Sequence, residues 1–136
     1  MEAPAQSPTL PAAVREFIAP ARFATIATLN PDGSAHQAVV WYLVEGDRII
    51  VNSRRSRRWP RNLMDRPEIS LAIYDVDNPE HWVGLRGDAR FLRDGDAALQ
   101  DIMTMALRYR SDPEESRGQD RVSFEVRVDR WFEYGA

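Results

Sequence analysis

The chain contains no cysteine and no lysine, and each absence excludes a class of chemistry. Without cysteine it forms no disulfide, no thiolate metal site and no cysteine nucleophile. Without lysine it forms neither a Schiff base nor a P-loop phosphate site, so arginine supplies all 18 basic side chains. Histidine is scarce as well. His36 and His81 are far apart and have no carboxylates at ligand spacing, so we expect no metal site.

Long hydrophobic runs are also missing. No stretch approaches the roughly 20 apolar residues that span a bilayer, and residues 1–11 lack the basic and then apolar layout of a signal peptide. We therefore expect a cytoplasmic protein that does not contact membranes. A length of 136 residues favours one domain over 1–136, in which residues 1–11, rich in Pro and Ala, form a loose N-terminal arm.

Runs of alternating or β-branched residues, separated by turn residues, predict a mainly β fold. The expected strands are 23–29, 35–44, 48–53, 69–74, 81–92 and 122–128, with turns at 30–33 and 45–47 and a loop at 75–79. Gly84 and Gly87 predict a bulge or sharp bend inside the fifth of these strands. Because closure removes exposed strand edges, a closed or nearly closed antiparallel barrel is the economical arrangement.

Helices are expected in three places. Residues 12–19 follow a proline and form a short helix, and a second short helix runs from Asn62 until Pro67 stops it. A longer helix is expected from Asp94 or Asp96 to about Tyr109, with apolar side chains on one face. The polar segment 111–120 that follows is expected to be a mobile loop.

A cluster of five arginines is the most informative feature, because the chain as a whole carries a net charge of −3. The cluster consists of Arg54, Arg55, Arg57, Arg58 and Arg61. It follows an apolar strand and precedes a short helix, a placement that favours a phosphate or polyanion site. A solvated basic stripe is the alternative. Since the overall charge is negative, anion recognition must be local, and we expect no nucleic-acid partner.

The order and spacing of several segments resemble the flavin- and deazaflavin-binding split β-barrel superfamily related to pyridoxamine 5′-phosphate oxidase. The resemblance is strongest to its small members that use coenzyme F420. The segments are residues 23–34, Val39-Val40-Trp41, Val51-Asn52-Ser53, Arg57-Arg58, Arg61-Asn62-Leu63, Pro67 and Asp77-Asn78-Pro79. The resemblance covers residues 14–130 and implies a six- to seven-stranded antiparallel split β-barrel. It also implies a homodimer with two cofactors in grooves between the barrels.

The resemblance further implies a set of cofactor-binding residues. These are Val39, Val40 and Trp41 along the ring, then Asn52, Ser53, Arg54, Arg55, Arg57, Arg58, Trp59, Arg61, Asn62, Asn78 and Pro79. Relatives usually carry a lysine in the stretch where this chain has Trp59 and Pro60, and this lysine commonly meets the cofactor. Arg54 and Arg55 are therefore candidates to supply the missing charge. Trp59 either stacks on the ring or packs the helix against the barrel.

Charge favours F420 over FMN as the cofactor, because F420 carries a phosphodiester and several glutamates whereas FMN presents one phosphate. FMN is the alternative cofactor. We expect a homodimer, in which Trp41, Trp82 and Trp131 contribute buried aromatic surface.

No residue is identified as catalytic, which suits an enzyme whose cofactor carries the chemistry. Tyr42, Tyr74 and Tyr109 are possible proton donors, although each also suits a packing role. The sequence predicts an F420-dependent oxidoreductase that transfers a hydride to an unsaturated or conjugated small molecule. An FMN-dependent oxidoreductase of the same fold, or a non-catalytic binder of flavin, F420 or a tetrapyrrole such as heme, is the alternative. Pyridoxamine 5′-phosphate oxidation is disfavoured, because residues 129–134 lack the Arg and His positions that this family uses for the substrate phosphate.

Overall fold

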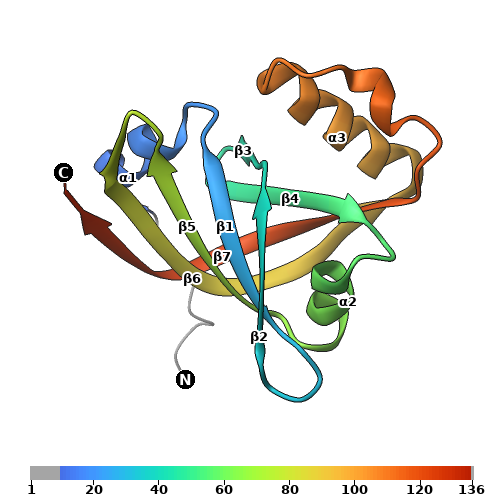
Figure 1. Ribbon diagram of the computed structural model, residues 1–136, viewed down its shortest axis with the longest axis horizontal. Helices are drawn as coiled ribbons and strands as arrows, with labels where there is room; N and C mark the ends of the chain where they lie inside the picture. Colours follow the sequence, from blue (N-terminus) through green and yellow to red (C-terminus); the bar gives the residue numbers. More distant parts are fainter. Residues whose placement is uncertain (1–9, 136) are drawn as a thin grey trace, which may run out of the picture.

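The structure, a computed structural model that describes residues 10–135, is built on one seven-stranded antiparallel sheet (Figure 1). The strands are β1 (Phe23–Leu29), β2 (Ala35–Val40), β3 (Leu43–Glu45), β4 (Arg48–Arg54), β5 (Glu68–Asp75), β6 (Asn78–Asp94) and β7 (Arg121–Tyr134). Their order across the sheet is β2-β1-β5-β6-β7-β4-β3. The helices are α1 (Ala12–Ile18), α2 (Arg58–Asp65), α3 (Gly95–Arg108) and the short 3₁₀-helix η1 (Pro113–Ser116). The predicted mainly β, antiparallel barrel is confirmed.

The barrel shape follows from the connection between the two edge strands. β2 and β3 lie at opposite edges of the sheet, yet only Trp41 and Tyr42 separate them in the chain. Two residues can bridge only a short distance, so the sheet must curl until its two edges approach each other. The prediction of one strand over 35–44 is therefore wrong. The chain breaks at Trp41-Tyr42 so that β2 pairs with β1 and β3 pairs with β4.

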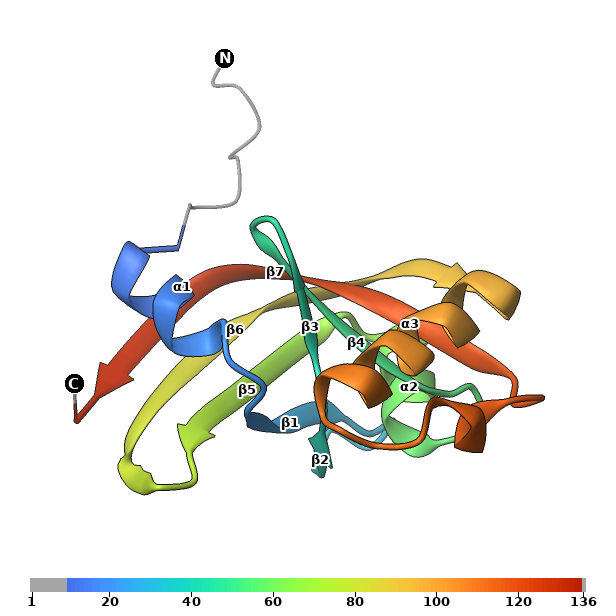
Figure 2. The same ribbon diagram turned by 90° about the horizontal axis from the view of Figure 1, so that it is seen from above.

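Alternating apolar side chains from the strands fill the barrel. Ile26, Leu71, Leu85 and Phe124 are buried there, as the period-two patterns predict. α1 and α2 close opposite ends of this core, and α3 lies on the outer side of the sheet near β4 (Figure 2). Beneath α3, a second apolar cluster includes Ile50 and Met105.

Several predicted boundaries differ from the structure. α2 begins at Arg58, earlier than predicted, so Trp59 and Pro60 belong to its first turn. Proline has no backbone N–H, but in the first turn of a helix this loss costs no hydrogen bond. β6 begins at Asn78, inside the predicted loop, and β7 continues to Tyr134. The segment 111–120 contains η1, which packs against α3.

The N-terminal arm predicted over residues 1–11 lies mostly outside the described residues. Leu10, its first described residue, is buried in the core. No helix within residues 10–135 is long and apolar enough to cross a membrane.

Gly87 marks the predicted bend in β6. The pairing of β6 with β7 shifts between Arg86 and Gly87. A Cβ atom at Gly87 would lie 1.7 Å from the backbone oxygen of Arg127. Only glycine allows the two strands to approach this closely.

Replacing Gly87 by alanine should therefore be severely destabilising, because a backbone clash cannot be relieved by rotating a side chain. We expect Gly87→Ala to lower the free energy of unfolding by at least about 3 kcal/mol in urea denaturation. Gly84→Ala is the matched control. Its added Cβ would meet only the side chains of Trp82 and Phe132, at 3.1 and 3.3 Å, and these can shift. Equal losses of unfolding free energy in the two variants would contradict the role of Gly87 in the close approach of β6 and β7.

Candidate functional site

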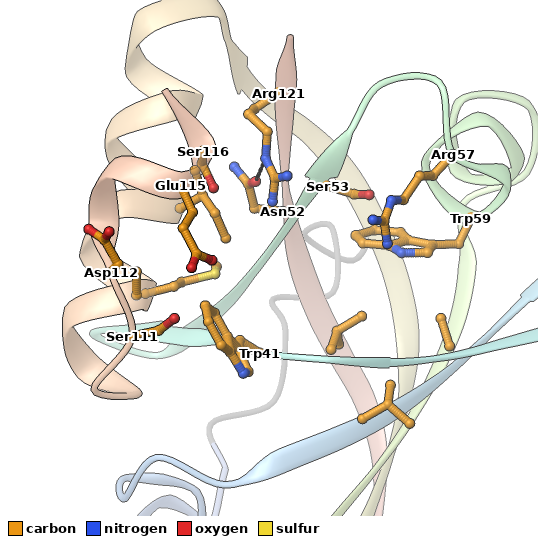
Figure 3. Close-up of a pocket in the computed structure, with 16 residues that line it drawn as sticks. Trp41, Asn52, Ser53, Arg57, Trp59, Ser111, Asp112, Glu115, Ser116 and Arg121 are labelled. Atoms are coloured by element: carbon orange, nitrogen blue, oxygen red, sulfur yellow. Dashed lines mark hydrogen bonds between the residues drawn. The ribbon is translucent and has the colours of Figure 1, made fainter. Parts of the chain in front are cut away.

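A pocket of about 360 Å³ lies between the β2–β4 region of the barrel and the layer of α3 and η1 (Figure 3). This volume falls within the range of small-molecule sites. The structure brings seven of the predicted site residues to this pocket. They are Val39, Val40, Trp41, Asn52, Ser53, Arg57 and Trp59.

The other arginines of the cluster lie outside the pocket. Arg55 forms ion pairs with Asp94 at 2.6 Å and Asp120 at 3.4 Å, so carboxylates already offset its charge. Arg54, Arg58 and Arg61 are exposed and form no side-chain ion pair within residues 10–135. Of the five clustered guanidinium groups, only that of Arg57 lines the pocket.

Three further predicted residues do not line the pocket either. The amide of Asn62 is buried and donates to Thr28 Oγ1 at 3.1 Å and to Asn30 Oδ1 at 3.0 Å, which ties α2 to β1 and its turn. Asn78 and Pro79 are exposed at the start of β6, in the hairpin beside α1 and away from α2 and α3 (Figure 1). Their participation in binding stays a prediction.

Arg121 is one of several pocket residues that the sequence analysis did not identify; Met105, Asp112 and Glu115 are others. The side chain of Arg121 lines the pocket although the residue is only 8% exposed. Its guanidinium donates to Asn52 Oδ1 at 2.8 Å and to Gln119 Oε1 at 2.9 Å, and both partners are neutral. Burial, together with the nearby charges of Arg57 and Arg54, lowers the pKa of Arg121 to about 10. A buried cation with neutral partners is costly, and an anion in the pocket would offset that cost.

A hydrogen-bond network fixes the position of Arg121. Asn52 Nδ2 donates to the backbone oxygen of Ala98 and to Ser123 Oγ, each at 2.8 Å. Ser123 Oγ in turn donates to Asp101 Oδ2 at 2.6 Å. The network therefore joins β4, β7 and α3 behind the pocket. Because the bond from Arg121 to Asn52 and the bonds that hold Asn52 and Ser123 are buried, the guanidinium has little freedom to move.

Trp41 forms an aromatic wall of the pocket and is supported from behind. Its ring stacks on Tyr109, with centroids 4.9 Å apart and planes inclined by 11°. The Tyr109 hydroxyl donates to the backbone oxygen of Arg22 at 2.6 Å and accepts from the Tyr42 N–H at 3.2 Å. This support leaves Trp41 as the aromatic surface that a ligand meets.

The tyrosines named as possible proton donors do not line the pocket. Tyr42 donates its hydroxyl to the backbone oxygen of Ile18 at 2.8 Å, and burial raises the pKa of Tyr42 far above its usual value. Burial also raises the pKa of Tyr109. Both hydroxyl groups therefore hold the fold together. Tyr74 lies on β5 and is likewise absent from the pocket lining.

Of the two roles considered for Trp59, the structure shows packing of α2 against the barrel, and Trp59 also lines the pocket. It is only 3% exposed, and its ring lies 6.3 Å from that of Phe124, centroid to centroid. Its indole and that of Trp41 both border the pocket (Figure 3). Trp59 is therefore a structural residue with one edge at the site.

The pocket is electrostatically asymmetric. Arg57 and Arg121 line it, and so do Asp112, which caps η1, and Glu115, which lies within η1 (Figure 3). Within residues 10–135, the pocket included, no group of three or more His, Asp or Glu side chains could hold a metal ion. The site is thus suited to a ligand with an anionic group at the arginine side.

The family model described as pyridoxamine 5′-phosphate oxidase matches residues 10–135. The chain belongs to this family. Membership in the pyridoxamine 5′-phosphate oxidase family confirms the resemblance read from the sequence segments. No protein of curated function matched the sequence.

Solved structures share the fold of this family member. A structure described as an F420 reductase has a TM-score of 0.78 and 21% identity, covering 90% of this chain and 98% of that one. A heme storage protein from Vibrio cholerae has a TM-score of 0.71 and 20% identity, covering 90% and 93%. A heme binding protein from Mycobacterium smegmatis has a TM-score of 0.71 and 24% identity, covering 93% and 55%. At these identities the similarity establishes the fold and leaves the ligand open.

The two indoles of the pocket should differ in their contribution to stability. Trp59→Ala should lower the free energy of unfolding by about 3–5 kcal/mol, because it leaves a cavity between α2 and the barrel. Trp41→Ala should cost less, since Trp41 is only half-buried and loses mainly its stack on Tyr109. Urea denaturation of both variants measures the difference. A urea denaturation curve for Trp59→Ala that matches that of the unsubstituted protein would contradict the packing role.

Proposed function

We propose that this protein is an F420-dependent oxidoreductase that transfers a hydride from reduced deazaflavin to an unsaturated or conjugated small molecule. One observation carries the proposal: the pocket combines a buried guanidinium that lacks an anionic partner, that of Arg121, with a second guanidinium from Arg57 and two indoles. A planar ring bearing a phosphate has the complementary chemistry. The residues therefore fit a flavin or deazaflavin cofactor.

Each part of the pocket would hold a different part of the cofactor. Arg57, Arg121 and the Ser53 hydroxyl would bind the phosphate, since charge-assisted hydrogen bonds favour anionic oxygens. Val39, Val40 and Trp41 would border the ring, and Trp59 would close one side. When bound, reduced F420 supplies the hydride, while these residues orient it and exclude water.

The choice of F420 over FMN is supported by the arginines outside the pocket. Arg54, Arg58 and Arg61 have exposed guanidinium groups without ion-pair partners among residues 10–135, and they lie on or next to α2. A tail of glutamates that leaves the pocket on the side of Arg57 would meet these charges. Asp112 and Glu115 would repel the tail from the η1 side. FMN, with no such tail, remains the alternative cofactor.

Heme binding without turnover is the competing function, and two of the structures of similar fold are described as heme proteins. Heme iron is usually held by His, Cys, Met or Tyr. The pocket lining includes Met105 but neither His36 nor His81. The ligand set therefore favours a flavin-type cofactor. Mixing the purified protein with hemin and recording its absorbance separates the two functions, because only a heme protein would show a shifted Soret band.

A homodimer is part of the proposal. Val39 lines the pocket although it is 70% exposed, so one rim of the pocket is open and apolar. A second copy that covers this rim would shield the ring of the cofactor from water. The aromatic pair Trp82–Tyr134 offers further surface, since Tyr134 is 60% exposed.

Fluorescence titration with F420 and with FMN tests the cofactor proposal. F420 should bind more tightly than FMN, and its affinity should fall as salt rises because the tail contacts are exposed. Arg57→Ala and Arg121→Gln should each lower the affinity for both cofactors by about tenfold or more, because each removes a charge-assisted contact. Arg58→Ala and Arg61→Ala should lower the affinity for F420 only. Tighter binding of FMN, or equal losses of both cofactors in Arg58→Ala, would count against F420.

The dimer prediction is tested by light scattering at micromolar concentration. We expect a particle with twice the monomer mass of 15.6 kDa. Val39→Glu should shift the particle toward the monomer, because it would place a charge in the proposed interface. A monomeric unsubstituted protein would refute the assembly.

A further inference from the structure

The turn after α3 determines which side chains face the arginines across the pocket. Arg110 has φ of 58°, the only non-glycine residue within 10–135 in the left-handed region. The backbone N–H of Ser111 donates to the oxygen of Ala106 at 2.7 Å, and that of Arg110 donates to the oxygen of Leu107 at 3.2 Å. These two bonds form a Schellman motif that ends α3 and redirects the chain. The redirected segment, residues 111–116, forms the wall of the pocket on the η1 side.

Two neighbouring glutamates on this wall have different environments. Glu114 forms a two-bond ion pair with Arg117, and it does not line the pocket. Glu115 lines the pocket, and its carboxylate makes no hydrogen bond or ion pair with any residue in 10–135. Figure 3 shows this carboxylate extending from η1 toward the interior, whereas Asp112 lies farther out. Asp112 also accepts a hydrogen bond from the N–H of Glu114, at 2.9 Å, as the cap of η1.

The pocket therefore has two poles of opposite charge. At one pole are the guanidinium groups of Arg57 and Arg121, and at the other is the unpaired carboxylate of Glu115. Trp41 and Met105 form apolar surface on the same pocket. Glu115 is itself exposed, so water partly screens its attraction for a complementary charge, and the effect on affinity is modest. A protonated nitrogen is the group that this carboxylate would recognise.

We propose that Glu115 is a specificity-determining residue that selects, at the η1 side of the pocket, a conjugated small molecule carrying a protonated nitrogen. This inference rests on the proposed function, which assigns the arginine side to the cofactor and leaves the η1 side for the second reactant. It narrows the substrate class from any conjugated molecule to a cationic one.

Two planar probes of the same ring system and opposite charge test the selection. 9-Aminoacridine is a cation near neutral pH and acridine-9-carboxylate is an anion, so both are titrated by fluorescence against the full chain. In Glu115→Gln, the affinity for 9-aminoacridine relative to acridine-9-carboxylate should fall about fivefold or more. Glu114→Gln is the matched control and should leave this ratio unchanged, since Glu114 does not line the pocket.

The outcomes separate this inference from the proposed function. An unchanged ratio in Glu115→Gln, or an equal fall in Glu114→Gln, would overturn the role of Glu115. Titrating F420 and FMN against the same variants gives the second readout. If neither cofactor binds but the ratio falls as expected, the cofactor proposal fails while the cation selection stands. If the cofactors bind and the ratio does not change, only the selection fails.

Discussion

The buried guanidinium of Arg121 is the constraint on which the pocket depends. A cation with only 8% exposure must be held by hydrogen bonds, and Asn52 and Gln119 provide them without cancelling its charge. Asn52 is positioned in turn by Ser123 and by the start of α3, so β4, β7 and α3 share one polar network. The arrangement costs free energy of desolvation, and it keeps a positive charge available to an anion in the pocket.

The same fold occurs in structures whose descriptions name different ligands. The barrel of this family occurs in structures described as an F420 reductase and as heme proteins, so the fold alone does not decide the ligand. We propose that in this chain the residues around the pocket decide the ligand. The side of Arg57 and Arg121 favours a phosphate, the rings of Trp41 and Trp59 border an apolar space, and Glu115 gives the other side a negative charge.

The strands, the barrel and the basic segment were predictable because they depend on local pattern and spacing. The break at Trp41-Tyr42 was not predictable, because strand pairing imposes it: β2, before the break, pairs with β1, and β3, after it, pairs with β4. Arg121 was missed for a similar reason: it faces Arg54 only through the register of β4 with β7. The clustered arginines share one sequence segment but point to different surroundings, which sequence spacing cannot reveal.

The affinities of riboflavin and FMN, measured by fluorescence titration on the same preparation, test the anion site most directly, because the two ligands differ only by a phosphate. A site centred on Arg57 and Arg121 should bind FMN about tenfold or more tightly than riboflavin. That difference should largely disappear in Arg121→Gln. Equal affinities of the unsubstituted protein for riboflavin and FMN would contradict the assignment of a phosphate to Arg121.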